Sequence, residues 1–202
     1  MLQAVNTVVF AEDRLVGHNT DTSGFREAFA RGLPGAGLHD VVLLGGGGAG
    51  AAVGHAVLEL GARRLRVLDT DRERAGQLAG ALSARFGAGR AEVADIGALG
   101  DLLARADGLI HATPTGMAAY PGTAVPAALL RPGLWVAEVV YMPVDTELLR
   151  NARVAGCRTL SGAAMVALQA AGSMELFTGA RPDRDRMLRH VEALITDGRQ
   201  AA

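Results

Sequence analysis

Short apolar runs alternate with longer segments of helical spacing along most of the chain. From residue 38 onward we expect strands at 41–44, 65–69, 91–94, 108–112, 135–140 and 157–160. Between them, apolar residues recur at the three- and four-residue spacing of amphipathic helices, and we expect helices at 49–60, 72–86, 96–105 and 145–154. Strands that alternate with helices of this length predict a parallel, doubly wound sheet. The expected fold class is therefore α/β.

The two ends of the chain have a different pattern from this core. We expect two short strands and a helix before the core and two helices after it, at 2–11, 15–19, 21–31, 163–178 and 182–197. A glycine-rich linker at 32–37 separates the first group from the core. Because a two-stranded hairpin is marginal by itself, we interpret both ends as parts of a second, smaller structural unit.

A glycine-rich loop follows the first apolar run of the core. Its register, Gly45-x-Gly47-x-x-Gly50, opens a helix directly after a strand, as in dinucleotide-binding folds. The three glycines permit a tight turn, close approach of a pyrophosphate and close packing of helix on strand. We expect the phosphates at the free N–H groups of the helix start, at Gly48 and Ala49. A purely structural glycine turn is the alternative.

An acidic residue ends the second apolar run of the core. Asp69 lies about 20 residues past the loop, where an acid accepts hydrogen bonds from the adenosine ribose hydroxyls. Asp71 adds a second carboxylate where NADP would carry its 2′-phosphate, so we expect NAD rather than NADP. Arg72 and Arg74 weigh against this preference, because either could turn toward a phosphate.

The composition restricts the remaining classes of function. The length of 202 residues is enough for one large domain, or for one domain and part of a second. The formal net charge is -1 and 50% of the residues are hydrophobic. Without a concentrated basic face we expect no nucleic-acid partner. No apolar run approaches the roughly 20 residues of a membrane span, and the start lacks the pattern of a signal peptide. We therefore expect a cytoplasmic protein with no membrane partner.

Cysteine, histidine and lysine usage narrows the chemistry further. The single cysteine, Cys157, rules out an internal disulfide and a multi-cysteine metal site, and we expect it to be a buried packing thiol. We expect no metal site, because no metal-ligand spacing links His18, His39, His55 and His190. All 20 residues counted as Lys or Arg are arginine, so no side chain of this chain can act as a tunable ammonium base.

A series of short motifs runs through essentially the whole chain. They lie at 4–8, 17–21, 23–25, 45–50, 112–117, 139–143 with Thr146, Gly162, Gln169 and 177–179. Together they resemble the shikimate dehydrogenase family, and especially its quinate/shikimate dehydrogenase branch. The resemblance implies a two-domain enzyme that oxidises a ring hydroxyl of shikimate or quinate to the ketone and passes hydride to NAD(P).

The resemblance also implies how the chain is divided. Residues 1–33 would form the rear part of the substrate-binding domain with a linking helix, and residues 38–160 the Rossmann-type dinucleotide-binding domain. Residues 161–202 would be helices that pack back on the substrate-binding domain. The expected fold is thus a doubly wound parallel sheet flanked by remnants of a smaller α/β domain.

Four polar residues acquire substrate-side roles from the resemblance. In the family a lysine–aspartate pair handles the proton as hydride leaves, and the aspartate falls on Asp21. A helix N-cap is the alternative role for Asp21. Asn6, Gln169 and Tyr141 match positions near the substrate. A satisfied turn residue and a surface glutamine are the alternatives for Asn6 and Gln169.

On the cofactor side, the resemblance implies contacts from Thr113 and Gly162. His111 and Glu138 depart from the family pattern, which usually has Asn and Asp at these places. His111 ends a strand, where ligands bind in open α/β sheets. It is therefore either a cofactor contact or a packed histidine.

The family lysine belongs to an N-terminal segment of the substrate-binding domain, and we expect this segment to be missing here. We therefore expect NAD binding but negligible dehydrogenase activity from these 202 residues alone. The expected partner is a small molecule of the shikimate/quinate class, and a homodimer is left open. One alternative is a non-catalytic NAD-binding module or a truncated paralogue completed by a separate chain. Another is an enzyme for a different cyclitol or an amino-shikimate.

Overall fold

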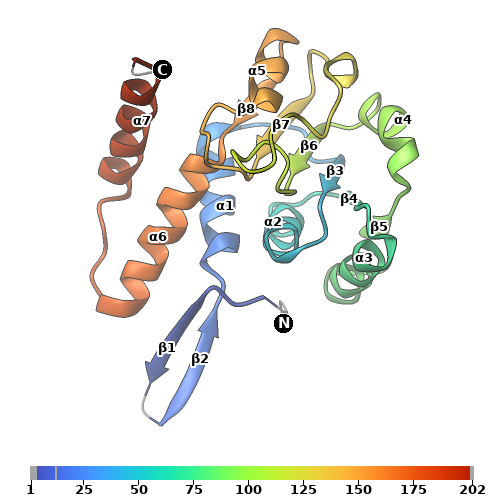
Figure 1. Ribbon diagram of the computed structural model, residues 1–202. Coiled ribbons are helices and arrows are strands. Elements are labelled where there is room, and N and C mark those ends of the chain that lie inside the picture. Colours follow the sequence, from blue (N-terminus) through green and yellow to red (C-terminus); the bar gives the residue numbers. More distant parts are fainter. Residues whose placement is uncertain (1–3, 12, 201–202) are drawn as a thin grey trace.

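The computed structural model describes residues 4–11 and 13–200. Its body is a parallel sheet with helices on both faces, and a two-stranded hairpin projects from this body (Figure 1). The sheet confirms the predicted α/β fold class.

Six parallel strands form the sheet. They are β3 (Asp40–Leu44), β4 (Arg64–Leu68), β5 (Ala91–Val93), β6 (Gly108–His111), β7 (Trp135–Glu138) and β8 (Arg158–Leu160). Their spatial order is β5-β4-β3-β6-β7-β8, and each neighbouring pair is parallel. The chain winds outward in both directions from β3 and β6. A crevice for ligands is expected at this reversal, outside the carboxyl ends of the strands.

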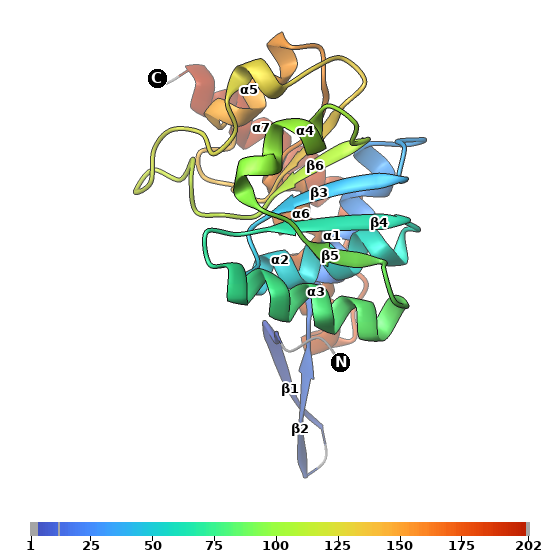
Figure 2. The same cartoon turned by 90° about the vertical axis from the view of Figure 1, so that its right-hand side faces the viewer.

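Both faces of the sheet are covered, as the apolar sequence of its strands requires. Side chains of successive strand residues point to opposite faces, so Val41 and Leu43 belong to one core cluster and Val42 and Leu44 to the other. The first cluster contains α1 (Thr20–Gly32), α2 (Gly48–Glu59), α3 (Arg72–Phe86) and α6 (Gly162–Thr178). The second contains α4 (Leu99–Leu103) and α5 (Glu147–Val154) on the opposite face (Figure 2).

Helices from the N-terminal and C-terminal parts of the chain pack together on one side of the sheet. The antiparallel strands β1 (Thr7–Ala11) and β2 (Arg14–His18) lead into α1, which packs along α6. These helices cross closely at Gly24, because a Cβ there would lie 2.7 Å from the backbone nitrogen of Gln169. The last helix, α7 (Arg184–Gln200), packs on α6.

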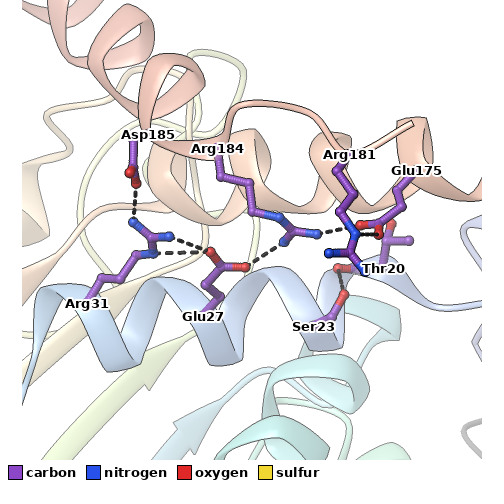
Figure 3. A network of polar contacts seen from close by, with 8 residues as sticks. All are labelled: Thr20, Ser23, Glu27, Arg31, Glu175, Arg181, Arg184 and Asp185. Carbon is purple, nitrogen blue, oxygen red and sulfur yellow. Dashed lines mark hydrogen bonds and ion pairs between the residues drawn. The ribbon is translucent and has the colours of Figure 1, made fainter. Parts of the chain in front are cut away.

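A network of ion pairs joins the start of α7 to α1 and α6 (Figure 3). The guanidinium of Arg184 lies 2.6 Å from a carboxylate oxygen of Glu27 and 2.9 Å from one of Glu175. A second arginine, Arg31, pairs with Asp185 at 2.5 Å. Because these groups are partly exposed, each pair stabilises the fold only modestly. Together these ion pairs hold the start of α7 against α1 and α6.

The structure corrects several predicted boundaries. The first predicted strand, 2–11, begins only at Thr7, and residues 2 and 3 lie outside the described part of the chain. The predicted strand 135–140 ends at Glu138, because the N–H of Val140 donates to the Glu138 side chain instead of extending the ladder. In place of one helix at 96–105, a 3₁₀ turn, Ile96–Ala98, precedes α4. A second 3₁₀ turn, Ala127–Leu129, was not predicted.

Candidate functional site

A cleft of about 540 Å³ lies at the carboxyl ends of the strands, between the loop after β3, the end of β4 and the loop after β6. This is the position at which open α/β sheets bind ligands, because the strand order reverses there. Six of the residues predicted to contact a cofactor line it: Gly45, Gly47, Gly48, Ala49, Asp69 and Thr113. The cleft therefore gathers most of the predicted cofactor residues at one place.

The glycines of the loop have two different physical roles. Gly45 has a φ of +104°, and a Cβ there would lie 2.5 Å from the carbonyl oxygen of Ala112. A Cβ on Gly50 would lie 2.0 Å from the carbonyl oxygen of Gly45, so both positions need glycine for the turn and its packing. Open space surrounds Gly47 and Gly48 instead. Gly47 has no side chain to cap α2, which leaves the first N–H groups of the helix available to phosphate oxygens.

Asp69 is anchored to the glycine loop. One carboxylate oxygen accepts from the N–H of Gly46 at 2.7 Å, and the other from the N–H of Asp71 at 2.9 Å. Burial raises the pKa of Asp69, but the hydrogen bonds from these two N–H groups and the nearby guanidinium of Arg74 together lower it by more. The pKa of Asp69 therefore lies below its ordinary value. A carboxylate offers about four lone-pair sites. Asp69 therefore remains ionised at neutral pH and retains acceptor capacity toward ribose hydroxyls.

A second polar cluster lies where the hairpin meets α1 and α6. The side-chain oxygen of Asn6 accepts from the backbone N–H of Thr20 at 2.9 Å, and the Thr20 hydroxyl donates to Gln169 at 3.1 Å. The hydroxyl of Ser173 lies 3.0 Å from those of Thr7 and Thr20. The structure thus brings Asn6 and Gln169 together through Thr20. Sequence reasoning did not single out this threonine, although it stands directly before the predicted catalytic aspartate.

Asp21 lies in the first turn of α1, beside this cluster. The N-cap of α1 is Asn19, whose side-chain oxygen accepts from the N–H of Thr22 at 3.1 Å. The alternative role of Asp21 as the N-cap is therefore wrong, because the helix begins one residue earlier, at Thr20. Burial raises the pKa of Asp21 above its ordinary value, and a hydrogen bond from Asn6 offsets only part of this shift. A carboxylate of raised pKa is a stronger proton acceptor than an exposed one.

Tyr141 and Gly162 are not among the residues that line the cleft. Tyr141 follows β7, and 48% of its surface is exposed. Gly162 begins α6, and a Cβ there would lie 2.4 Å from the carbonyl oxygen of Val139. The close packing of α6 against the backbone at Val139 is sufficient to explain why glycine is needed at this position, with no ligand involved. Contacts of Tyr141 with substrate and of Gly162 with cofactor remain predictions.

His111 is a packed histidine whose ring is connected to the cleft. It is 1% exposed, and its Nδ1 lies 2.8 Å from Oε1 of Glu138. Its Nε2 lies 2.5 Å from the hydroxyl of Thr113, which lines the cleft. The histidine therefore stands behind Thr113 rather than in the cleft itself. Sequence reasoning noted His111 and Glu138 separately but did not pair them.

The remaining predictions concern metals, the cysteine and membranes. Within residues 4–11 and 13–200, the structure contains no cluster of three or more His, Cys, Asp or Glu placed to hold a metal ion. Cys157 is buried and donates to the carbonyl oxygen of Arg131 at 3.2 Å. Over the same described residues, the helices lack the length and apolar character needed to cross a bilayer.

Known proteins resemble this chain over nearly its whole length, although no protein-family model matches it. A shikimate dehydrogenase (NADP(+)) of Streptomyces avermitilis is 59% identical over 193 residues, which cover 96% of this chain and 66% of that protein. A quinate/shikimate dehydrogenase (NAD(+)) of Corynebacterium efficiens is 46% identical over 187 residues, which cover 92% of this chain and 66% of that protein. This chain therefore spans about 66% of the length of these relatives.

The fold agrees with this similarity. The structure of quinate dehydrogenase from Corynebacterium glutamicum in complex with NAD superposes with a TM-score of 0.89 at 45% identity, covering 95% of this chain and 68% of that one. The strand order, the glycine loop and the acid after β4 are the features of a dinucleotide-binding sheet. The chain therefore belongs to the family of shikimate and quinate/shikimate dehydrogenases.

Proposed function

We propose that this chain binds NAD in the cleft between β3 and β6 and acts in a shikimate/quinate-type dehydrogenase. The reaction is reversible hydride transfer between a ring hydroxyl of shikimate or quinate and the ketone of 3-dehydroshikimate or 3-dehydroquinate. The observation that carries the proposal is the ionised Asp69, held by the N–H of Gly46 beside the bare backbone at Gly47 and Gly48. This geometry offers N–H donors to a pyrophosphate and a carboxylate to a ribose.

The charges at the ribose end favour NAD over NADP. Asp69 and Asp71 both lie at the end of β4, where a 2′-phosphate would meet two carboxylates. The guanidinium of Arg74 already lies 3.9 Å from Asp69 and 3.3 Å from Asp71. Its charge is therefore shared between two acids before any ligand binds. The names of the relatives include both cofactors, NADP(+) for the Streptomyces avermitilis protein and NAD(+) for the Corynebacterium efficiens protein. The preference of this chain for NAD is therefore proposed from the local charges.

On the substrate side, we propose Asp21 as the group that takes the hydroxyl proton. Alcohol oxidation by hydride loss needs a proton acceptor near the reacting oxygen. The raised pKa of Asp21 suits that task, and Asn6 and Gln169 lie beside it as candidate substrate contacts. Because all 20 basic residues counted as Lys or Arg are arginine, a lysine partner for Asp21 would have to come from outside these 202 residues.

Calorimetric titration with NAD and NADP tests the cofactor proposal. NAD should bind more tightly than NADP, and the opposite order would overturn the preference. Asp69→Ala should weaken NAD binding, and Glu73→Ala is its matched control, because it removes the same negative charge from an exposed position on the first turn of α3. It should leave NAD binding unchanged.

An activity assay with shikimate and quinate tests the reaction. The 202 residues should be assayed alone and mixed with a separately produced N-terminal segment of the Streptomyces avermitilis relative. Activity that appears only in the mixture and depends on NAD would support the proposal. Robust turnover by these residues alone would show that Asp21 needs no lysine partner from outside them. NAD binding without turnover in either case would favour a non-catalytic NAD-binding module.

A further inference from the structure

A series of hydrogen-bonded, buried polar side chains lies behind the cleft, at the carboxyl ends of β6 and β7. His111 is 1% exposed and Glu138 is 2% exposed, and the two are in direct contact at 2.8 Å. The other carboxylate oxygen of Glu138 lies 3.1 Å from the hydroxyl of Thr146. Burying such groups is costly unless they are paired and hydrogen-bonded. The arrangement is satisfied along its whole length, and it ends at the cleft.

The direction of each hydrogen bond follows from the donors that surround Glu138. Its Oε1 accepts from the backbone N–H of Val140 at 3.1 Å. The hydroxyl oxygen of Thr146 accepts from the N–H of Leu149 at 3.3 Å, so its hydrogen is directed to Oε2 of Glu138. Both oxygens of Glu138 are therefore acceptors, and Nδ1 of His111 carries a proton and donates it. The ring orientation is fixed by this bond, which leaves Nε2 to face Thr113.

Thr113 is held by two contacts. Its hydroxyl oxygen lies 2.5 Å from Nε2 of His111 and accepts from the N–H of Thr115 at 3.3 Å. A threonine hydroxyl has one donor and two acceptor sites, so one site remains for a ligand. Thr113 also lines the cleft. The histidine and the backbone together hold this free site in one orientation.

The sheet order shows which half of a dinucleotide this site would meet. In the proposed cofactor site, Asp69 would hold the adenosine ribose next to the end of β4, and the start of α2 would hold the pyrophosphate near β3. The other half of the cofactor would then extend over β6 and β7, the strands that end in His111 and Glu138. Thr113 lies two residues after the end of β6 and would therefore be on the nicotinamide side.

We propose that His111 and Glu138 are positioning residues that aim the hydroxyl of Thr113 at the nicotinamide half of the cofactor. The ribose hydroxyls and the carboxamide of that half supply complementary hydrogen-bonding groups. This inference rests on the proposed cofactor site and extends it from Asp69 to the opposite end of the cleft.

The experiment compares the affinities of NADH and ADP, because ADP lacks the nicotinamide and its ribose. Thr113→Val should weaken NADH binding by about 3- to 10-fold, the equivalent of one neutral hydrogen bond, and leave ADP binding unchanged. Thr113→Ser keeps the hydroxyl and is the matched control. It should bind both ligands like the unchanged chain.

His111→Asn tests the role of the ring. The side-chain amide nitrogen of Asn can occupy the place of Nδ1 and donate to Glu138, but nothing replaces Nε2 next to Thr113. This variant should lose NADH affinity by a similar factor and keep ADP affinity. Combining it with Thr113→Val should add no further loss, because both changes remove the same interaction. If His111→Asn does not fold, Glu138→Gln should show a loss in the same direction, confined to NADH.

The outcomes separate this inference from the proposed function. Equal losses for NADH and ADP, or additive losses in the double variant, would show that His111 only stabilises the fold and would overturn the inference. Unchanged NADH affinity in Thr113→Val would overturn it as well. If the unchanged chain binds neither ligand, the proposed cofactor site itself fails.

Discussion

Replacing Asp69 removes the carboxylate that joins the glycine loop to the end of β4. In the structure this group accepts from the N–H of Gly46 at 2.7 Å and from that of Asp71 at 2.9 Å. Asp69→Ala leaves both N–H groups without this partner and removes the acceptor proposed for the ribose. The change therefore acts on the ligand directly and on the loop that holds the pyrophosphate.

The expected loss follows from the hydrogen bonds involved. A hydrogen bond to a charged group contributes about 1.5–3 kcal/mol, and water can replace part of it in a partly open cleft. We expect Asp69→Ala to weaken NAD binding by about 1–3 kcal/mol, or about 5- to 150-fold. NADP binding should fall less, because the carboxylate that repels its 2′-phosphate is also lost. The preference for NAD should therefore narrow.

Asp69→Asn separates the two effects. Its amide oxygen can still accept from the N–H of Gly46, but the negative charge is absent. This variant should keep more of its NAD affinity than Asp69→Ala and should bind NADP better than the unchanged chain. Titration calorimetry with both cofactors measures these affinities, and thermal unfolding without ligand shows whether the loop anchor also affects stability. If both cofactors bind to Asp69→Ala as before, Asp69 does not contact the ribose and the proposed placement of the dinucleotide is wrong.

Three further predictions address the loop, a buried histidine and the proposed base. Gly50→Ala should destabilise the fold by about 1–3 kcal/mol in chemical unfolding, because its Cβ would lie 2.0 Å from the carbonyl oxygen of Gly45. Gly48→Ala, where space is open, should unfold like the unchanged chain and weaken only NAD binding. Burial lowers the pKa of His55, so the unfolded chain takes up this proton at a higher pH than the folded chain and stability falls as the pH drops below about 6.5. His55→Gln should therefore show a smaller fall in Tm between about pH 8 and about pH 5, and an equal fall would contradict the assignment. Asp21→Asn should reduce the activity of the complemented enzyme by about 10²–10⁴-fold. Because the raised pKa of Asp21 disfavours its ionised form in the folded chain, this variant should not lower the Tm at neutral pH, and a large drop would indicate a structural role.

The sequence by itself determined the features that depend on local spacing. Alternating apolar runs and helical segments predicted each strand of the parallel sheet, because burial on both faces produces continuous apolar runs. The glycine register predicted the turn after β3. Gly45 has a positive φ, and a Cβ on Gly50 would clash with Gly45, so both positions need glycine for reasons that arise within the loop itself. Boundaries were less accurate where side chains compete with the backbone, as at Glu138 and in the 3₁₀ turn at Ile96–Ala98.

Only the tertiary structure decided which polar groups meet. Gly46 and Asp69 are 23 residues apart, His111 and Glu138 are 27 apart, and Thr20 and Gln169 are 149 apart. No periodicity within one element specifies such pairs, because they depend on the order of the strands and on the crossing of α1 with α6 at Gly24. The sequence therefore indicated Asp69, His111 and Glu138 one at a time. The parallel sheet placed them at the same edge, where the ends of separate strands become neighbours.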